Sequence, residues 1–221
     1  QAVRACAAFC GGRLQGDEVG SRTIVFQPGR IRKGGEFRFD IGTAGSATML
    51  AFTLIPLALF AERPSRFCLT GGLFQDFAPG AFHMRDVLLT HLAGMGARVR
   101  MSVERPGYVP KGGGRLLLEV EPARSPLTSL RRLEPGKPRR FRGIALASHL
   151  AEEKVAGRMA ERCRELLQGD IPGEFEIVQD TSALQKGAAL FLAAETSTGC
   201  ILGADRAGKR GRRSEAIAEF V

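Results

Sequence analysis

The chain has 221 residues, of which 44% are hydrophobic and 25% are charged. This balance supports a folded protein with a core and excludes a chain that is disordered throughout. Lys and Arg outnumber Asp and Glu by 32 to 23, and the formal charge of +9 favours a polyanionic partner, such as nucleic acid or an anionic membrane surface. A protein that simply uses Arg often would carry the same charge.

Cysteine usage and hydropathy predict a cytoplasmic protein that does not enter a membrane. The five cysteines are odd in number and contain no CxxC pair, which argues against the disulfide framework of a small secreted domain. The most apolar run, residues 49–60, is much shorter than the roughly twenty residues of a spanning helix. The chain begins with Gln1 in a helical pattern, so we expect a sequence cut from a longer protein.

The first half of the chain is predicted to open with a helix, two strands and a second helix. Small apolar residues predict a helix over 2–10 that ends at a Gly pair. Strands are expected over 22–27 and 36–41, between turn-forming Pro and Gly residues. Hydroxyl side chains at Thr43–Ser46 can cap backbone N–H groups and begin a second helix that runs to Ala61.

A similar order of elements returns about eighty residues later. A strand is expected over 66–70, a helix with a one-sided apolar stripe follows Pro79, and strands follow over 97–104 and 115–121. The repeat predicts duplicated α/β modules in which helices cover one face of each sheet.

Prolines and basic residues crowd between Pro122 and Arg142, which predicts a boundary between domains of residues 1–130 and 131–221. The second domain is expected to contain, in chain order, a strand over 142–148, a helix over 150–167, strands over 174–178, 188–194 and 199–202, and a helix over 213–221. The last helix has no cap, which again indicates a cut chain.

The histidines do not indicate a metal or catalytic site. His83, His91 and His149 lack the spacing of metal ligands, and none has a Ser, Cys or carboxylate partner close in sequence. His91 lies on the apolar stripe of its helix, which favours a core or interface role over catalysis. We therefore predict no metal-ligating residue in this chain.

Three patterns bear on anion binding. The helix start at Thr43–Ser46 offers free N–H groups and the positive end of the helix dipole. The Gly-rich segment Lys111–Gly114 lacks a phosphate-loop pattern and is expected to be a structural turn. Two basic clusters, Arg131–Arg142 and Arg206–Arg213, are either solvated faces or phosphate-binding surfaces.

Several stretches together resemble the central portion of the RNA 3'-terminal phosphate cyclase family. They are FQPG at 26–29, IGTAGS at 41–46, PSR at 64–66 with LTGG at 69–72, and GYVPKGGG at 107–114; AETSTGC at 194–200 with GKRG at 208–211 resembles the inserted domain of the family. The resemblance implies an α/β (α+β) fold of repeated helix-on-sheet modules, as in enolpyruvyl transferases, with a smaller thioredoxin-like inserted domain.

The resemblance also implies a reaction, that of an AMP-forming ligase in RNA processing. A histidine attacks the α-phosphate of ATP, the adenylate passes to an RNA 3'-phosphate end, and the neighbouring 2'-hydroxyl displaces AMP to leave a 2',3'-cyclic phosphate. ATP and a divalent metal, Mg or Mn, are the implied cofactors, because a cation offsets phosphate charge. RNA 3'-phosphate ends are the implied partners, and no oligomeric state follows from the sequence.

The chain departs from the family in its functional residues. The N-terminal Gly-rich segment and the C-terminal segment with the nucleophilic histidine have no counterpart here, so the resemblance implies no catalytic residue and we expect these 221 residues alone to be inactive. Pro79 matches the proline that packs against adenine. Phe52 stands where the family has a nucleotide-contacting Gln, and a Phe can stack on adenine but cannot make the amide hydrogen bonds. The usual Gly-Gly-Thr reads Gly-Gly-Leu at Leu73.

Two other functions stay open. Phe52 and Leu73 favour a catalytically inactive relative that binds RNA in ribosome biogenesis. A transferase of the enolpyruvyl type would share the modules but not the chemistry.

Overall fold

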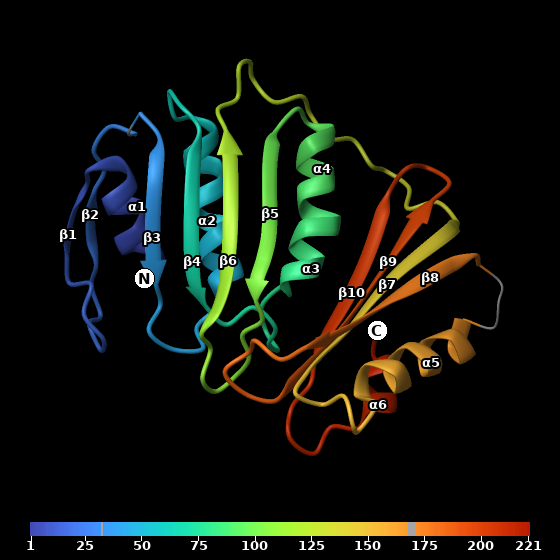
Figure 1. Ribbon diagram of the computed structural model, residues 1–221. Helices are drawn as coiled ribbons and strands as arrows, with labels where there is room; N and C mark the ends of the chain where they lie inside the picture. Colours follow the sequence, from blue (N-terminus) through green and yellow to red (C-terminus); the bar gives the residue numbers. More distant parts are fainter. Residues whose placement is uncertain (32, 168–170) are drawn as a thin grey trace.

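Two four-stranded sheets and a two-stranded ribbon form the framework of the protein, with helices packed on both larger sheets (Figure 1). The structure is a computed structural model that describes residues 1–31, 33–167 and 171–221. The mixture of helices and sheets confirms the α/β fold class expected from the sequence.

The first sheet has the strand order β3 (Gly35–Asp40), β4 (Ser65–Gly71), β6 (Gly114–Glu121), β5 (Arg98–Arg105). Strands β3 and β4 are parallel and are joined by helix α2 (Ala47–Leu59), whereas β4–β6 and β6–β5 are antiparallel. Burial alternates along β6, which places Leu116, Leu118 and Val120 in the core and charged residues on the opposite face.

A second, segmented helix packs against the same core. It consists of α3 (Ala81–His83), a π-helical turn η1 (Met84–Leu88) and α4 (Leu89–Gly94). The stripe after Pro79 therefore forms a helix, as expected, but with a π-helical turn that the 3.6-residue period does not predict.

The N-terminal region contains a short strand that the sequence does not predict, and the strand expected over 22–27 forms only over Val25–Gln27. Helix α1 (Ala2–Cys10) is where we expect it, but it leads into a short strand β1 (Arg13–Gln15) that pairs antiparallel with β2 (Val25–Gln27). The expected strand 36–41 is β3, which pairs with β4 instead. The strand β1 was missed because three residues are too few to show an alternating pattern. In order of elements, α1–β1–β2 corresponds to α4–β5–β6.

The second sheet has the order β10 (Ile201–Ala207), β9 (Gly187–Thr196), β7 (Pro138–Ser148), β8 (Gly173–Asp180). A helix, α5 (Val155–Leu167), joins the parallel strands β7 and β8, and the antiparallel pair β9–β10 is followed by α6 (Ser214–Ala218). The unit has the mixed helices and strands expected of a smaller α/β domain. Strand β8 forms one end of the sheet and carries the exposed side chains of Glu174 and Glu176.

Several boundaries in this region differ from the prediction, among them that of β10, which runs over Ile201–Ala207 instead of 199–202. Strand β7 begins at Pro138 instead of Arg142, so Arg139 and Arg140 lie on a strand rather than in a linker. Helix α5 begins at Val155 instead of Leu150, after a turn in which Lys154 has a positive φ of 51°.

The two large sheets share one hydrophobic core. Ile144, Leu146 and Phe191 from the second sheet pack in the same cluster as Phe74 and Met84 from the first unit. The opposite face of the second sheet packs on α5 and α6 in a separate cluster. The segment 122–137 connects the two units at one end of the sheets (Figure 1). The division into domains at residue 130 stays a prediction.

All five cysteines are free thiols. Within the described ranges, no helix combines the length and the apolar character needed to cross a bilayer.

Candidate nucleotide-binding site

The N-terminus of α2 is built by a tightly bonded loop. The Ser46 hydroxyl accepts a hydrogen bond from the Met49 N–H at 3.0 Å and caps the helix, as expected. The Asp40 carboxylate accepts from the Gly42 N–H at 2.8 Å, and the Gly72 carbonyl accepts from the Ala47 N–H at 2.9 Å. The first turn has no acidic residue, so no carboxylate on α2 offsets the positive end of the helix dipole, but its Ala47 and Met49 N–H groups are already bonded.

Gly72 is required where this loop meets the end of β4. A Cβ atom at Gly72 would lie 2.4 Å from the Ala44 carbonyl oxygen, so any side chain would push the loop away. The Gly pair of the sequence motif therefore allows two backbone segments to approach each other closely.

Both residues predicted to bind the nucleotide lie at this end of α2. The Thr48 hydroxyl, in the first turn, donates a hydrogen bond of 2.7 Å to the Pro79 carbonyl. Phe52 follows Thr48 by one turn and is 50% exposed, and Pro79 is also exposed. The structure thus brings Phe52 and Pro79 to one region of the surface, and their role in binding stays a prediction.

The segment 74–80, which carries Pro79, is held by two contacts from the second unit, an ion pair and a hydrogen bond to a carboxylate. Asp76 accepts hydrogen bonds of 3.0 and 2.8 Å from the Arg212 guanidinium, and Arg206 lies 3.5 Å from the same carboxylate. The bonds from Arg212 lower the pKa of Asp76, and the same pairing raises the pKa of Arg212. The carboxylate therefore stays charged at neutral pH and fixes the segment.

Asp205 on β10 makes the second contact. Its carboxylate accepts a 3.0 Å hydrogen bond from the Gly80 N–H, at the start of α3. The Nδ1 atom of His83 lies 3.0 Å from the other Asp205 oxygen, close enough for an ion pair but without the alignment of a hydrogen bond. No local sequence pattern predicts this contact, because Gly80 and Asp205 are 125 positions apart.

Replacing Asp205 with Ala is expected to loosen segment 74–80. The Gly80 N–H loses its acceptor, and a lost buried hydrogen bond of this kind costs about 1–3 kcal/mol, so amide exchange in residues 74–83 should accelerate about tenfold or more. Hydrogen exchange followed by mass spectrometry measures this. Glu153→Ala, which breaks the exposed Lys186–Glu153 pair, should leave the segment unchanged. Equal exchange in Asp205→Ala and the parent chain would contradict the anchoring role.

The other candidates have structural roles. The turn at Lys111–Gly114 is confirmed, with φ of 67° at Gly112 and 66° at Gly113. His91 Nε2 lies 3.3 Å from the Ile201 carbonyl oxygen, which confirms its interface role. Leu73 is buried in the core.

His149 Nε2 lies 2.7 Å from the Ala183 carbonyl oxygen, so this histidine joins two loops of the second unit. Across residues 1–31, 33–167 and 171–221, no three His, Cys, Asp or Glu side chains converge as metal ligands.

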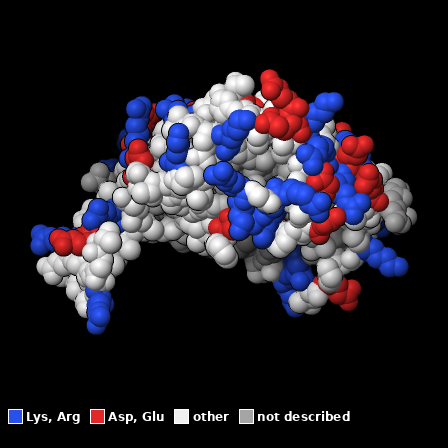
Figure 2. Space-filling model, turned by 90° about the horizontal axis from the view of Figure 1, so that it is seen from below, with Lys and Arg blue, Asp and Glu red and all other residues white. Residues whose placement is uncertain are grey.

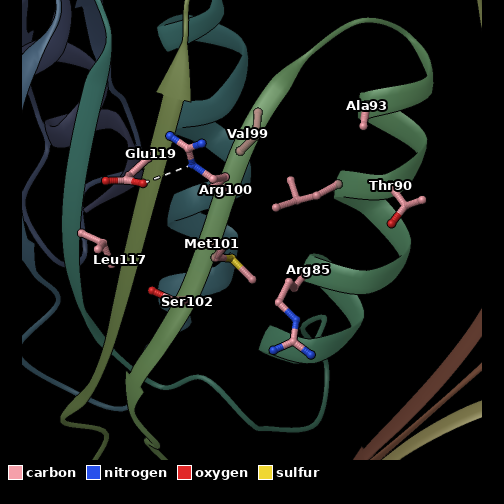
Figure 3. Close-up of a pocket in the computed structure, with 10 residues that line it drawn as sticks. Arg85, Thr90, Ala93, Val99, Arg100, Met101, Ser102, Leu117 and Glu119 are labelled. Carbon is pink, nitrogen blue, oxygen red and sulfur yellow. Dashed lines mark ion pairs between the residues drawn. The ribbon is translucent and has the colours of Figure 1, made fainter.

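A cavity of about 560 Å³ lies elsewhere, between α4 and β5 (Figure 3). Its wall combines the apolar side chains of Val99 and Met101 with the Arg100–Glu119 ion pair, whose closest atoms are 3.4 Å apart. Phe52 and Pro79 lie outside it.

The sequence model described as RNA 3'-terminal phosphate cyclase matches residues 1–204. An RNA 3'-terminal phosphate cyclase from Pyrobaculum neutrophilum is 33% identical over 97% of this chain and 61% of its own length. Proteins of the same name from Pseudomonas fluorescens and Methylococcus capsulatus are 42% and 34% identical, over 76% and 99% of this chain and 48% and 62% of their own lengths. The chain thus spans less than two thirds of each of these relatives. By these matches, the chain belongs to the RNA 3'-terminal phosphate cyclase family.

Proposed function

We propose that the protein carrying this chain uses ATP to convert an RNA 3'-terminal phosphate into a 2',3'-cyclic phosphate. The observation that supports this most is the joint exposure of Phe52 and Pro79 near the N-terminus of α2. An aromatic face can stack on adenine, and the positive end of the α2 dipole favours the negative charge of a phosphate. Family membership supports the same reaction.

The reaction proceeds in three displacements. In the first, a histidine attacks the α-phosphorus of ATP and pyrophosphate leaves. In the second, an oxygen of the RNA 3'-phosphate takes the adenylate from the histidine. In the third, the 2'-hydroxyl attacks the 3'-phosphorus, loses its proton and expels AMP. His83, His91 and His149 each have a structural contact, with Asp205, the Ile201 carbonyl and the Ala183 carbonyl respectively. We propose that this chain supplies the nucleotide surface and not the nucleophile.

The divalent cation, Mg²⁺ or Mn²⁺, would offset charge on the triphosphate. The described residues do not form a cluster of ligands for it, so we assign it no protein ligand and no step. The free state of the five cysteines supports a reducing, cytoplasmic setting.

One observation favours a second function. Phe52 cannot make the hydrogen bonds of an amide, which would weaken recognition of adenine. A catalytically inactive, cyclase-like protein that binds RNA in ribosome biogenesis is the alternative.

Labelled ATP separates these functions. The protein carrying this chain, incubated with ATP labelled at the α-phosphorus, Mg²⁺ or Mn²⁺ and an RNA ending in a 3'-phosphate, is expected to form an acid-labile, histidine-linked AMP adduct and then the cyclic end. RNA binding without an adduct would support the inactive alternative. The 221-residue chain alone is expected to bind ATP without an adduct, and turnover by it would refute our assignment of roles.

A further inference from the structure

The loop between β10 and α6, residues 208–213, is fixed beside segment 74–80. Arg212 bonds to Asp76 and also donates to the Ala207 carbonyl at 2.5 Å. Arg206, at the end of β10, lies over the Phe220 ring at 3.9 Å from its centroid. These contacts hold the loop in one position relative to Pro79, because Asp76 and Pro79 share a short segment.

The remaining basic residues of the loop are unpaired. Lys209, Arg210 and Arg213 are exposed, and none forms an ion pair within the part of the chain that the structure describes. Seen from below, Lys and Arg side chains gather over the middle of the face, next to a largely uncharged surface at the ends of the first-sheet strands (Figure 2). The loop therefore presents three exposed cations without ion-pair partners among the described residues, close to the candidate nucleotide site.

We propose that Lys209, Arg210 and Arg213 bind the phosphate backbone of single-stranded RNA whose 3' end reaches the nucleotide at Phe52 and Pro79. This inference rests on the proposed function. The run from Lys209 to Arg213 contains no aromatic residue, so contacts to phosphates rather than base stacking explain its composition. Because Asp76 already neutralises Arg212, the three unpaired cations are the ones available to a strand.

The second basic cluster of the sequence lies at the other end of β10. The Thr198 hydroxyl, which precedes this strand, lies 3.0 Å from both the Glu134 and the Pro135 carbonyl oxygens in the connecting segment 122–137 and donates its one hydrogen there. The seven residues of β10 separate this end from loop 208–213 by about 20 Å. Arg124, Arg131 and Arg132 of the connecting segment are exposed and likewise form no ion pair within the described residues. They offer a matched control on a different surface.

Two triple variants of the 221-residue chain test the proposal, and each changes the net charge by the same amount. In the loop variant Lys209, Arg210 and Arg213 become Glu; in the control variant Arg124, Arg131 and Arg132 become Glu. Fluorescence anisotropy at several salt concentrations measures binding of a labelled single-stranded RNA that ends in a 3'-phosphate. Each phosphate contact on a single strand contributes about 0.7 to the slope of log K against log salt, so the loop variant should lose about 2 in slope. The control variant should keep the slope of the parent chain.

Titration calorimetry with ATP separates this proposal from the proposed function. ATP affinity should be the same in both variants and in the parent chain. If the loop variant loses ATP binding as well, the loop serves the triphosphate and the proposal is overturned. An equal loss of RNA binding in both variants, or none in the loop variant, also overturns it. If the protein forms no AMP adduct but the loop variant still loses salt dependence relative to the control variant, the RNA surface stays supported. That result counts only against catalysis.

Variants with Gln in place of Glu at the same three positions remove charge without reversing it. If a Glu variant does not fold, the Gln variants can be measured in its place. The expected decrease in the slope of log K against log salt is the same, because the same three phosphate contacts are lost.

Discussion

Replacing Phe191 with Ala is expected to lower the free energy of unfolding by about 3–5 kcal/mol and to uncouple the two large sheets. Phe191 lies on β9, is 1% exposed and belongs to the core that both sheets share. Its ring meets the His83 ring edge-on, with centroids 6.0 Å apart. Removal of the ring leaves a cavity between the two sheets. Neither sheet can fill this cavity without shifting relative to the other.

Two spectroscopic probes can follow this effect in denaturant. Circular dichroism reports all secondary structure, whereas the fluorescence of Tyr108, the only tyrosine in a chain without Trp, reports the contact between the units. The Tyr108 hydroxyl lies 2.8 Å from the Ser148 hydroxyl at the end of β7. In the parent chain both probes should change together, and in Phe191→Ala the tyrosine signal should change first.

Phe175→Ala is the matched control for this experiment. Phe175 packs against Phe141 on the α5 side of the second sheet, with ring centroids 5.5 Å apart. Its loss should lower the unfolding midpoint while the two probes still coincide. An unchanged midpoint in Phe191→Ala would contradict a shared core.

Replacing Phe52 with Ala is expected to weaken ATP binding about tenfold or more. Stacking of a base on an aromatic side chain is worth about 1–3 kcal/mol by alanine substitution, and the half-exposed ring of Phe52 is the aromatic group at the start of α2. Titration calorimetry of the 221-residue chain with ATP measures the change. Phe52→Gln should bind more tightly than Phe52→Ala, because an amide can form hydrogen bonds with adenine.

Phe60→Ala provides the control on the same region of the chain. Phe60 directly follows α2, lies about two turns beyond Phe52 and is 76% exposed. The same substitution there removes an exposed ring far from the helix start, so ATP affinity should not change. Equal losses in the two variants, or none in Phe52→Ala, would refute the assignment of Phe52 to the nucleotide.

The sequence predicts an element well when its local pattern of apolar, capping and turn residues agrees with the place of that element in the fold. Strand β6 has apolar residues at alternate positions and a Gly on its N-terminal side, so both its extent and its buried face follow from the pattern. Helix α2 is likewise predictable at its start, because the hydroxyl side chain of Ser46 that marks the helix start in the sequence also caps the helix in the structure. In contrast, β7 begins at Pro138 among basic residues, and only its pairing with β9 makes these residues part of a sheet.

The candidate site is predicted only in part. Phe52 and Pro79 come from the family resemblance, and their proximity comes from the Thr48 hydrogen bond to Pro79. Asp76 and Arg212 are 136 positions apart, and no local pattern links a carboxylate in one unit to an arginine in the other. Sequence patterns identify basic clusters, but the structure is needed to show which of their members are already paired.

The outer strand of the second sheet bears on how the protein behaves at high concentration. Among the described residues, β8 has a strand neighbour on one side only, so its other side offers backbone donors and acceptors to a foreign chain. Glu174 and Glu176 are exposed along this margin. A second copy that approached edge to edge would bring its own glutamates close to them, and like charges across paired strands repel. Glu174 also lies 3.7 Å from the Arg140 guanidinium, and charged side chains on an edge strand of this kind disfavour self-association through β-sheet extension.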